Sequence, residues 1–206
     1  RTETRADELV SEVQVIDRAA IEAATARTLP ELLAREAGVQ FASNGGLGQL
    51  SSVFIRGTQS RHTILLVDGV RLGSATSGGP VWETLPLEMI DRIEVLKGPA
   101  SALYGSDGAG GVVQIFTRKG QAGFHPHASL SAGSFGHAQA SAGASGGEGA
   151  WRYAFSAQRT VQEGFNATNP NAPYGNHNPD RDPFRQNAAN GSLQYQINRD
   201  WQLDGS

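Results

Sequence analysis

The chain has 206 residues, a formal net charge of −3, 26 glycines and no cysteine. The lack of cysteine excludes a disulfide framework and a thiolate metal site, and the mild acidity gives no sign of a nucleic-acid-binding surface. No run of about 18 apolar residues occurs, so the sequence predicts no membrane-spanning helix.

Helical and strand patterns alternate along roughly the first 120 residues, which fits a small mixed α/β domain with its own core. Asp17 and Thr28 are candidate N-caps of two helices, and Gly38 ends the second. The other predicted elements are strands at Val13–Ile16, Val53–Arg56, Ile64–Val67, Ile93–Leu96 and Val112–Thr117, and short helices at Leu87–Ile90 and Ala100–Tyr104.

Beyond residue 120 the pattern becomes an alternation of period two. It is clearest where Trp151, Tyr153 and Phe155 alternate with Arg152 and Ala154. A soluble antiparallel sheet with one wet face produces the same alternation, and the alternation alone favours that structure. The predicted strands cover about 127–133, 137–145, 150–161 and 188–197, with a fifth beginning at Trp201.

The lengths of the turns favour an outer-membrane barrel instead. Gly146–Gly149 and Asn198–Asp200 are short turns, whereas residues 163–187 form a long segment rich in Asn, Pro and Gly. Membrane barrels have short periplasmic turns and longer extracellular loops. Trp151 and Trp201 each follow a short turn, as an interfacial girdle of aromatic residues requires.

The glycine-rich segment between Lys97 and Gly111 does not have the spacing of a phosphate-binding loop. Ser106 and Asp107 follow Gly105, where a P-loop requires Lys and Ser or Thr, and the later glycines lead into a strand instead of a helix. These glycines are predicted to serve tight turns and close backbone approaches.

Several separated segments together resemble the plug domain of TonB-dependent outer-membrane transporters, over roughly residues 8–119. They are Phe54–Gly57, Leu66–Val70, Ile90–Pro99, Tyr104–Gly111 and Val112–Thr117. The resemblance implies an α+β plug domain followed by antiparallel strands of a transmembrane β-barrel, in a fragment of a plugged barrel of about 22 strands. The expected domains are a plug at 8–120 and the first barrel strands at 121–206.

The resemblance also implies the partners. The TonB protein pulls on an N-terminal Ton box, and residues 1–7 are expected to be an extension that follows a Ton box outside this chain. The expected location is the outer membrane of a Gram-negative bacterium, in contact with its lipid and with no nucleic acid. No catalytic arrangement is present, so no enzyme activity is expected.

The resemblance implies import of a scarce nutrient. The sequence of Gly48–Ser52, which precedes Phe54–Gly57, is especially similar to that of cobalamin-transporting members, so cobalamin or a related corrinoid is the expected ligand. A ferric siderophore or haem is the alternative ligand. An alternative of another class is a plug-like signalling or interaction domain without transport, which should end near Gly120.

Two loops are expected to form the ligand surface, and two cations the contact between plug and barrel. An amide and hydroxyl surface without arginines suits a ligand whose rim carries neutral amides. Arg56 and Lys97, each beside a glycine, are expected to pair with glutamates of the barrel wall. The ligand candidates are Asn44, Gln49, Leu50 and Ser51 in the first loop and Ala75, Thr76 and Ser77 in the second.

Metal sites have weaker support. His125 and His127 share one strand face, but no third ligand lies near them in sequence. Asp180 and Asp182 begin a pattern like a calcium loop, in which Pro183 replaces the glycine and no glutamate follows. They are the calcium candidates in an extracellular loop, and no other cofactor is expected.

Overall fold

The computed structural model describes residues 12–76, 78–98, 106–171 and 177–206. The chain divides into two compact units. The first unit comprises Arg1–Ser43 and Leu50–Thr117, and the second comprises Asn44–Gln49 and Arg118–Ser206. No helix in the described part of the chain is long and apolar enough to cross a membrane.

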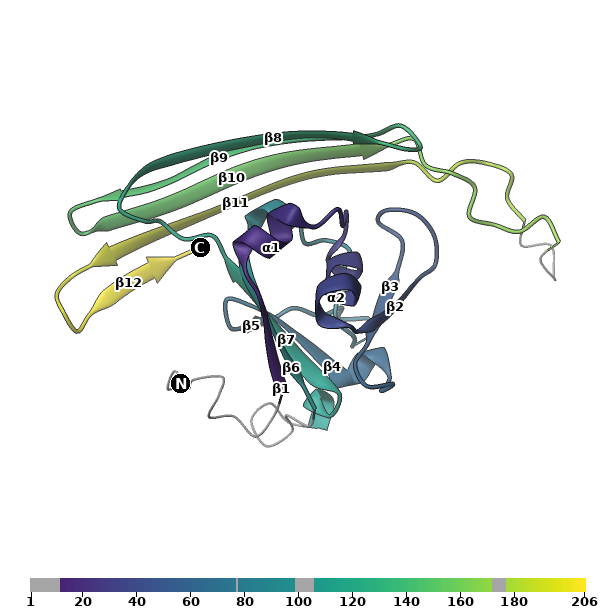
Figure 1. Cartoon of the computed structure of the whole chain (residues 1–206), viewed down its shortest axis with the longest axis horizontal. Coiled ribbons are helices and arrows are strands. Elements are labelled where there is room, and N and C mark those ends of the chain that lie inside the picture. The colour runs from purple at the N-terminus through teal and green to yellow at the C-terminus, as the bar shows by residue number, and fades with distance from the viewer. Residues whose placement is uncertain (1–11, 77, 99–105, 172–176) are drawn as a thin grey trace. The chain divides into compact units, whose positions relative to one another are not determined.

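A five-stranded mixed sheet forms the centre of the first unit, in the order β1-β6-β7-β4-β5 (Figure 1). Only β4 and β7 pair in parallel, and the other neighbours are antiparallel. A separate hairpin joins β2 (Gln40–Ser43) to β3 (Ser51–Phe54). The sheet strands are β1 (Glu12–Ile16), β4 (Thr63–Val67), β5 (Val70–Arg71), β6 (Ile90–Lys97) and β7 (Gly111–Thr117).

Both expected helix caps are confirmed. The side chain of Asp17 accepts a hydrogen bond from the Ala20 amide at the start of α1 (Arg18–Ala23). Thr28 does the same for α2 (Leu29–Ala37), which ends at Gly38 in the left-handed conformation, with φ 61°. Each cap satisfies an amide that the first helical turn leaves without a partner.

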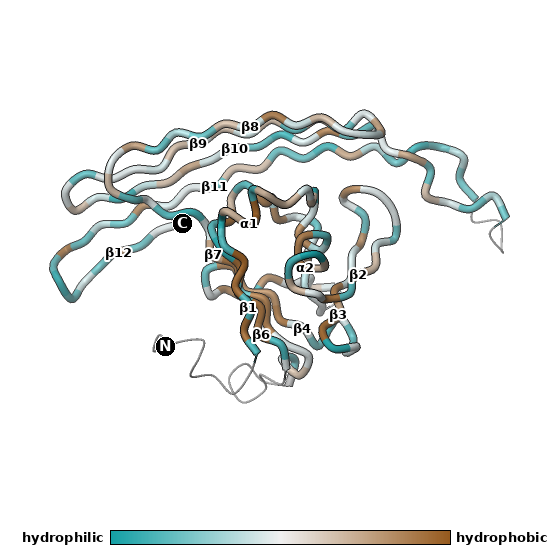
Figure 2. The backbone as a smooth tube through the Cα atoms, viewed as in Figure 1, coloured by the Kyte–Doolittle hydropathy of each residue, from teal (hydrophilic) through white to brown (hydrophobic). Residues whose placement is uncertain are grey.

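The helices and the sheet of the first unit share one hydrophobic core. Leu29, Leu32 and Leu33 of α2 are fully buried, as the apolar stripe of this helix predicts. Ile93 of β6 and Val113 of β7 are equally buried. Figure 2 shows mostly hydrophobic colour along β4 (TILLV) and β7 (GVVQIFT), which is typical of strands that are covered by other elements.

The second unit contains an antiparallel sheet in the order β12-β11-β10-β9-β8 (Figure 1). Each strand pairs with its neighbour in sequence, so the sheet is a simple meander. The strands are β8 (Gly123–Gly133), β9 (His137–Glu148), β10 (Trp151–Gln162), β11 (Phe184–Gln196) and β12 (Gln202–Gly205).

Some predicted bounds in the first unit are wrong. β3 ends at Phe54 instead of Arg56, because Arg56 takes a left-handed turn with φ 51°. Leu87–Met89 is a single 3-10 turn, and Ile90 already belongs to β6. The predicted helix Ala100–Tyr104 lies outside the described residues.

In the second unit, one end of each of three strands differs from the prediction by three residues or more. β8 begins at Gly123 and contains Pro126, which a strand tolerates here because β8 is at the sheet edge. β9 continues to Glu148, so the turn is at Gly149 and Ala150 instead of Gly146–Gly149. β11 begins at Phe184 instead of residue 188.

Candidate functional site

The first candidate loop is the tip of the β2–β3 hairpin. Ser43 and Ser51 are the last paired residues, and Asn44 to Leu50 connect them. The side chains of Asn44 and Gln49 are exposed, and Leu50 keeps 62% of its surface exposed. An exposed leucine between an amide and a hydroxyl offers both apolar contact and hydrogen bonds to a ligand.

Asn44–Gln49 belong to the second unit, and two glycines among them lie against aromatic rings of that same unit. A Cβ on Gly48 would be 2.3 Å from the ring of Phe184, and one on Gly46 would be 3.4 Å from the ring of Phe165. Gly48 also has φ +79°, and the Gln49 amide donates to the Gly46 carbonyl at 3.3 Å. Position 48 therefore requires glycine for two reasons. Its positive φ favours glycine, and the Phe184 ring fills the space that a side chain would need.

The second candidate loop is closed by its own backbone. The Ser74 amide donates to the Gly79 carbonyl at 2.8 Å, and the Gly78 amide donates to the Ser74 carbonyl at 2.9 Å. Ala75 and Thr76 are exposed at its tip. The predicted contact Ser77 lies outside the described residues.

Within the first unit, a carboxylate links the first residue of β3, which follows the first loop, to the segment that follows the second loop. The Ser51 amide donates to Oε1 of Glu83, which follows the fully buried Trp82. Sequence reasoning missed Glu83, because a lone glutamate in a turn-rich segment gives no pattern. Its role here is to hold the start of β3 against the segment that carries Ala75 and Thr76.

Arg56 and Lys97 both pair with Glu12. Arg56 Nη2 is 3.3 Å from Glu12 Oε2, and Lys97 Nζ is 2.9 Å from Glu12 Oε1. The hydrogen bond and charge of Lys97, followed by those of Arg56, lower the pKa of the Glu12 carboxyl. The partner in the described structure is thus a carboxylate of β1, and the barrel glutamates expected from the resemblance remain a prediction.

Glycine makes this charge cluster sterically possible. A Cβ on Gly98 would be 3.3 Å from Arg56 Nη1, and Gly98 has φ +123°. Gly98 also donates its amide to the Gly110 carbonyl at 3.2 Å. A glycine therefore follows each cation, at Gly57 and Gly98. These small turn residues let Arg56 and Lys97 both reach the Glu12 carboxylate.

The metal candidates are not brought together. In the part of the chain that the structure describes, no group of three or more His, Cys, Asp or Glu residues could hold a metal ion. His125 Nε2 lies 2.8 Å from the Ala122 carbonyl, and Asp182 donates its amide to the Phe165 carbonyl at 3.3 Å. Calcium binding at Asp180 and Asp182 remains a prediction.

The sheet of the second unit separates its residues by face. Leu130, Phe155 and Leu193 are exposed on one face, while Ser141 and Thr160 are buried on the other. The register places these exposed residues on a common side, as strand alternation requires. The exposed side chains are the apolar ones, which is the reverse of a soluble sheet with one wet face.

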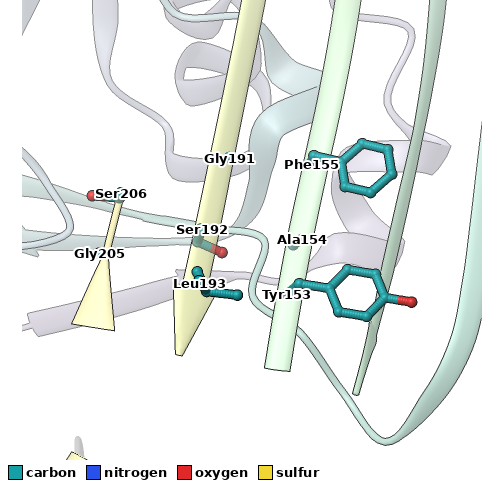
Figure 3. Close-up of a pocket in the computed structure, with 8 residues that line it drawn as sticks. All are labelled: Tyr153, Ala154, Phe155, Gly191, Ser192, Leu193, Gly205 and Ser206. Carbon is teal, nitrogen blue, oxygen red and sulfur yellow. The ribbon is translucent and has the colours of Figure 1, made fainter. Parts of the chain in front are cut away.

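A shallow hollow of ≈340 Å³ lies on the apolar face, between β10, β11 and the end of β12 (Figure 3). The rings of Tyr153 and Phe155 stack beside it with centroids 6.3 Å apart. Gly191 lies opposite Phe155 and has no side chain to fill the space. The hollow is open and lined mainly by apolar side chains and glycine, and no ligand is assigned to it.

Comparison with known proteins connects these features. The family model described as TonB-dependent Receptor Plug Domain matches residues 5–112. The vitamin B12 transporter BtuB of Vibrio cholerae is 36% identical over 98% of this chain, and that of Vibrio vulnificus is 34% identical over 95%. The alignments cover 33% and 31% of those relatives, so the chain spans about a third of their length.

Solved structures show the same fold. The ferric enterobactin receptor PfeA of Pseudomonas aeruginosa superposes with a TM-score of 0.73 over 96% of this chain and 32% of its own, at 24% identity. The siderophore receptor PirA of Acinetobacter baumannii gives 0.66 over 91% of this chain and 29% of its own, at 27% identity. The chain therefore carries a plug domain followed by antiparallel strands and belongs to the TonB-dependent receptors, a family of Gram-negative outer-membrane transporters and receptors and not of enzymes.

Proposed function

We propose that this chain is the plug and the first membrane strands of a TonB-dependent importer whose ligand is cobalamin or a related corrinoid. The observation that carries the proposal is the plug match over residues 5–112 together with relatives that are named vitamin B12 transporters. In this role the loops at 44–51 and 73–82 meet the ligand, and the sheet from β8 onward faces lipid.

The chemistry of the first loop supports a neutral, amide-rich ligand. Asn44, Gln49 and Ser51 supply amide and hydroxyl groups, and Leu50 supplies an exposed apolar contact. No lysine or arginine occurs from Asn44 to Ser52 or from Gly73 to Gly79. Anionic iron chelates favour arginine clusters, so the two loops suit a corrinoid better than a siderophore.

A siderophore importer is the second candidate, favoured by the likeness to PfeA and PirA. That likeness concerns the fold, and both candidates share it. A plug-like signalling module is less well supported, because such a module needs no membrane strands after Gly120. The meander from β8 to β12 has the outward apolar face that a transporter requires.

Coupling to TonB would act through the N-terminal side of Glu12. β1 is an edge strand of the first sheet and pairs only with β6 among the described strands. A force on residues before Glu12 would reach the Glu12 contacts with Arg56 and Lys97 first. Import would then require this edge to yield while the core behind it keeps the plug folded.

The test is equilibrium binding of cyanocobalamin and of several ferric siderophores to the purified full-length receptor. Replacing Gln49 and Ser51 together by alanine removes two side-chain hydrogen-bonding groups, each worth roughly 0.5–1.5 kcal/mol, so corrinoid affinity should fall about tenfold. The control is Gln14→Ala, at a residue of β1 that belongs to neither loop. Tight siderophore binding without corrinoid binding would overturn the ligand and leave the transporter class intact.

A further inference from the structure

The apolar face of β10 and β11 changes character at one end. Alternate residues of β10 share this face, and the register gives each a partner on β11. Toward the turn after β11 all of these pairs are apolar, and toward the long segment between the strands they become cationic. The pairs run in order Trp151–Tyr195, Tyr153–Leu193, Phe155–Gly191, Ala157–Ala189, Arg159–Asn187 and Val161–Arg185.

Arg159 and Arg185 are neighbours on this face. Arg159 is directly opposite Asn187, and Arg185 is two residues from Asn187 on the same strand. Diagonal pairs of this kind have their backbones about 7–8 Å apart, within reach of long side chains. Two guanidinium groups and one amide therefore share a single patch.

Neither arginine has a hydrogen bond or ion pair with a residue that the structure describes. Both are exposed, whereas the nearby Arg181 pairs with Glu163 at 3.4 Å. Among the residues within the four strands β8, β9, β10 and β11, the one acidic residue is Glu148, which is opposite Trp151 at the other end of β10. The patch thus carries two positive charges without a carboxylate from its own strands.

The strand geometry sets the depth of this patch. From Trp151 to Arg159 the strand rises roughly 26 Å, or about 20 Å along the membrane normal at a tilt near 40°. Arg185, which is opposite Val161 and one pair further, is about 25 Å from the level of Trp151 by the same geometry. The apolar band of an outer-membrane barrel is about 25 Å tall, so the two arginines are at its far edge.

The long segment after β10 identifies that edge as the extracellular one. Guanidinium groups there can leave the acyl chains and reach the headgroup layer. A phosphate monoester offers several oxygens in the geometry that two guanidinium forks and an amide recognise. This chemistry favours a phosphorylated lipid over a zwitterionic one, whose own ammonium group competes for the phosphate.

We propose that Arg159, Arg185 and Asn187 form a binding site for the phosphorylated headgroup of a glycolipid in the outer leaflet. The proposal rests on the proposed function in one respect, namely that these strands are inserted in the outer membrane. It does not depend on which nutrient is imported. Its effect is to hold an anionic lipid beside the start of the long loop between β10 and β11.

The experiment is native mass spectrometry of the full-length receptor in detergent with added lipid A. Dephosphorylated lipid A and inorganic phosphate are parallel probes. Arg159→Gln with Arg185→Gln should lower the bound fraction of phosphorylated lipid A about tenfold, with little change for the dephosphorylated lipid. Arg199→Gln, the same change in the turn between β11 and β12, should leave lipid binding unchanged.

Different outcomes of this experiment test the site and the identity of its ligand separately. Equal lipid A retention by the double variant and the wild type, or no preference for the phosphorylated lipid, overturns the site. Strong binding of inorganic phosphate alone would overturn the lipid as the ligand. If the double variant does not fold, Arg159→Lys with Arg185→Lys keeps the charge without the planar fork, and intermediate retention is expected. Cyanocobalamin binding on the same preparation reports separately on the proposed function.

Discussion

The two units of the chain place their apolar side chains in opposite ways. In the first unit, Leu32, Ile93 and Val113 are fully buried between helices and sheet. In the second unit, the buried hydrophobic residues are only Ala144 and Ala154 among those described, while large apolar side chains are exposed. The first unit therefore supplies its own apolar environment, and the second requires one from outside.

This difference shows that the two parts of one chain are adapted to two environments, water around the first unit and lipid around the sheet of the second. In the first unit the central strands β4 and β7 are mostly apolar, as in a covered sheet, whereas in the second unit β10 alternates and exposes its large apolar side chains. Replacing the same type of residue should therefore change the free energy of folding or of membrane insertion by different amounts in the two units. The predictions below use matched substitutions to test that difference.

The largest expected effect is on the core of the first unit. Leu32→Ala should destabilise the first unit by about 2–5 kcal/mol, because Leu32 is fully buried and its loss leaves a cavity. Leu130→Ala, at a side chain that is 87% exposed, should leave the first unit unchanged. Hydrogen exchange of β4 and β7 in the full-length receptor measures both. Equal effects of the two changes would contradict the comparison.

The next effect concerns the outward face of the sheet. Ala157→Arg puts a charge near the middle of the apolar band and should cost about 2–4 kcal/mol of insertion free energy. Gln158→Arg, one residue along β10 and on the opposite face, should cost much less. The folded fraction in phosphatidylcholine vesicles distinguishes them. If Gln158→Arg proved the more harmful, the assignment of faces would be reversed.

A smaller effect is expected at Arg18, which ties α1 to the start of β6. Its Nη1 donates to the Leu87 and Ile90 carbonyls at 3.0 and 2.9 Å, and its Nη2 contacts Glu88 Oε2 at 3.1 Å. Arg18→Met should cost about 1–3 kcal/mol in urea unfolding. Arg27→Met, an exposed change near the other helix, is the control. No difference between the two variants would show that these hydrogen bonds contribute nothing net.

The smallest effect is the pH dependence of Glu12. Its pKa is lowered by Lys97 and Arg56, so its stabilising contribution is present above the ordinary Glu value of about 4.3 and is lost as the pH falls through the lowered pKa. Glu12→Gln should lower the thermal midpoint slightly at pH 7 and have no effect in strong acid. Glu36→Gln is the control. A difference that grows in acid would contradict the assigned pairing.

The sequence predicted the elements whose signals are local. Asp17 and Thr28 cap helices, Gly38 ends one, and the alternation around Trp151 gives β10 its faces. The resemblance then placed these elements in one family, which the plug match confirms. The fold class could thus be predicted from the sequence.

Contacts between distant residues could not be predicted in the same way. The pairing of Glu12 with Arg56 and Lys97 depends on β1 lying beside β6, and strand order has no local signal. The tolerance of β8 for Pro126 likewise depends on β8 being an edge strand, which only the strand order reveals. Gly48 resembled an ordinary loop glycine until the Phe184 ring was seen to fill its space.

The most direct test of the central claim is a thermal melt of residues 8–119 expressed alone in water and followed by circular dichroism. A unit with its own core should unfold in one cooperative transition and should be more soluble than the longer chain, whose added strands expose an apolar face. A featureless melt with a random-coil spectrum would contradict the claim, because the first unit would then depend on the strands as they depend on lipid.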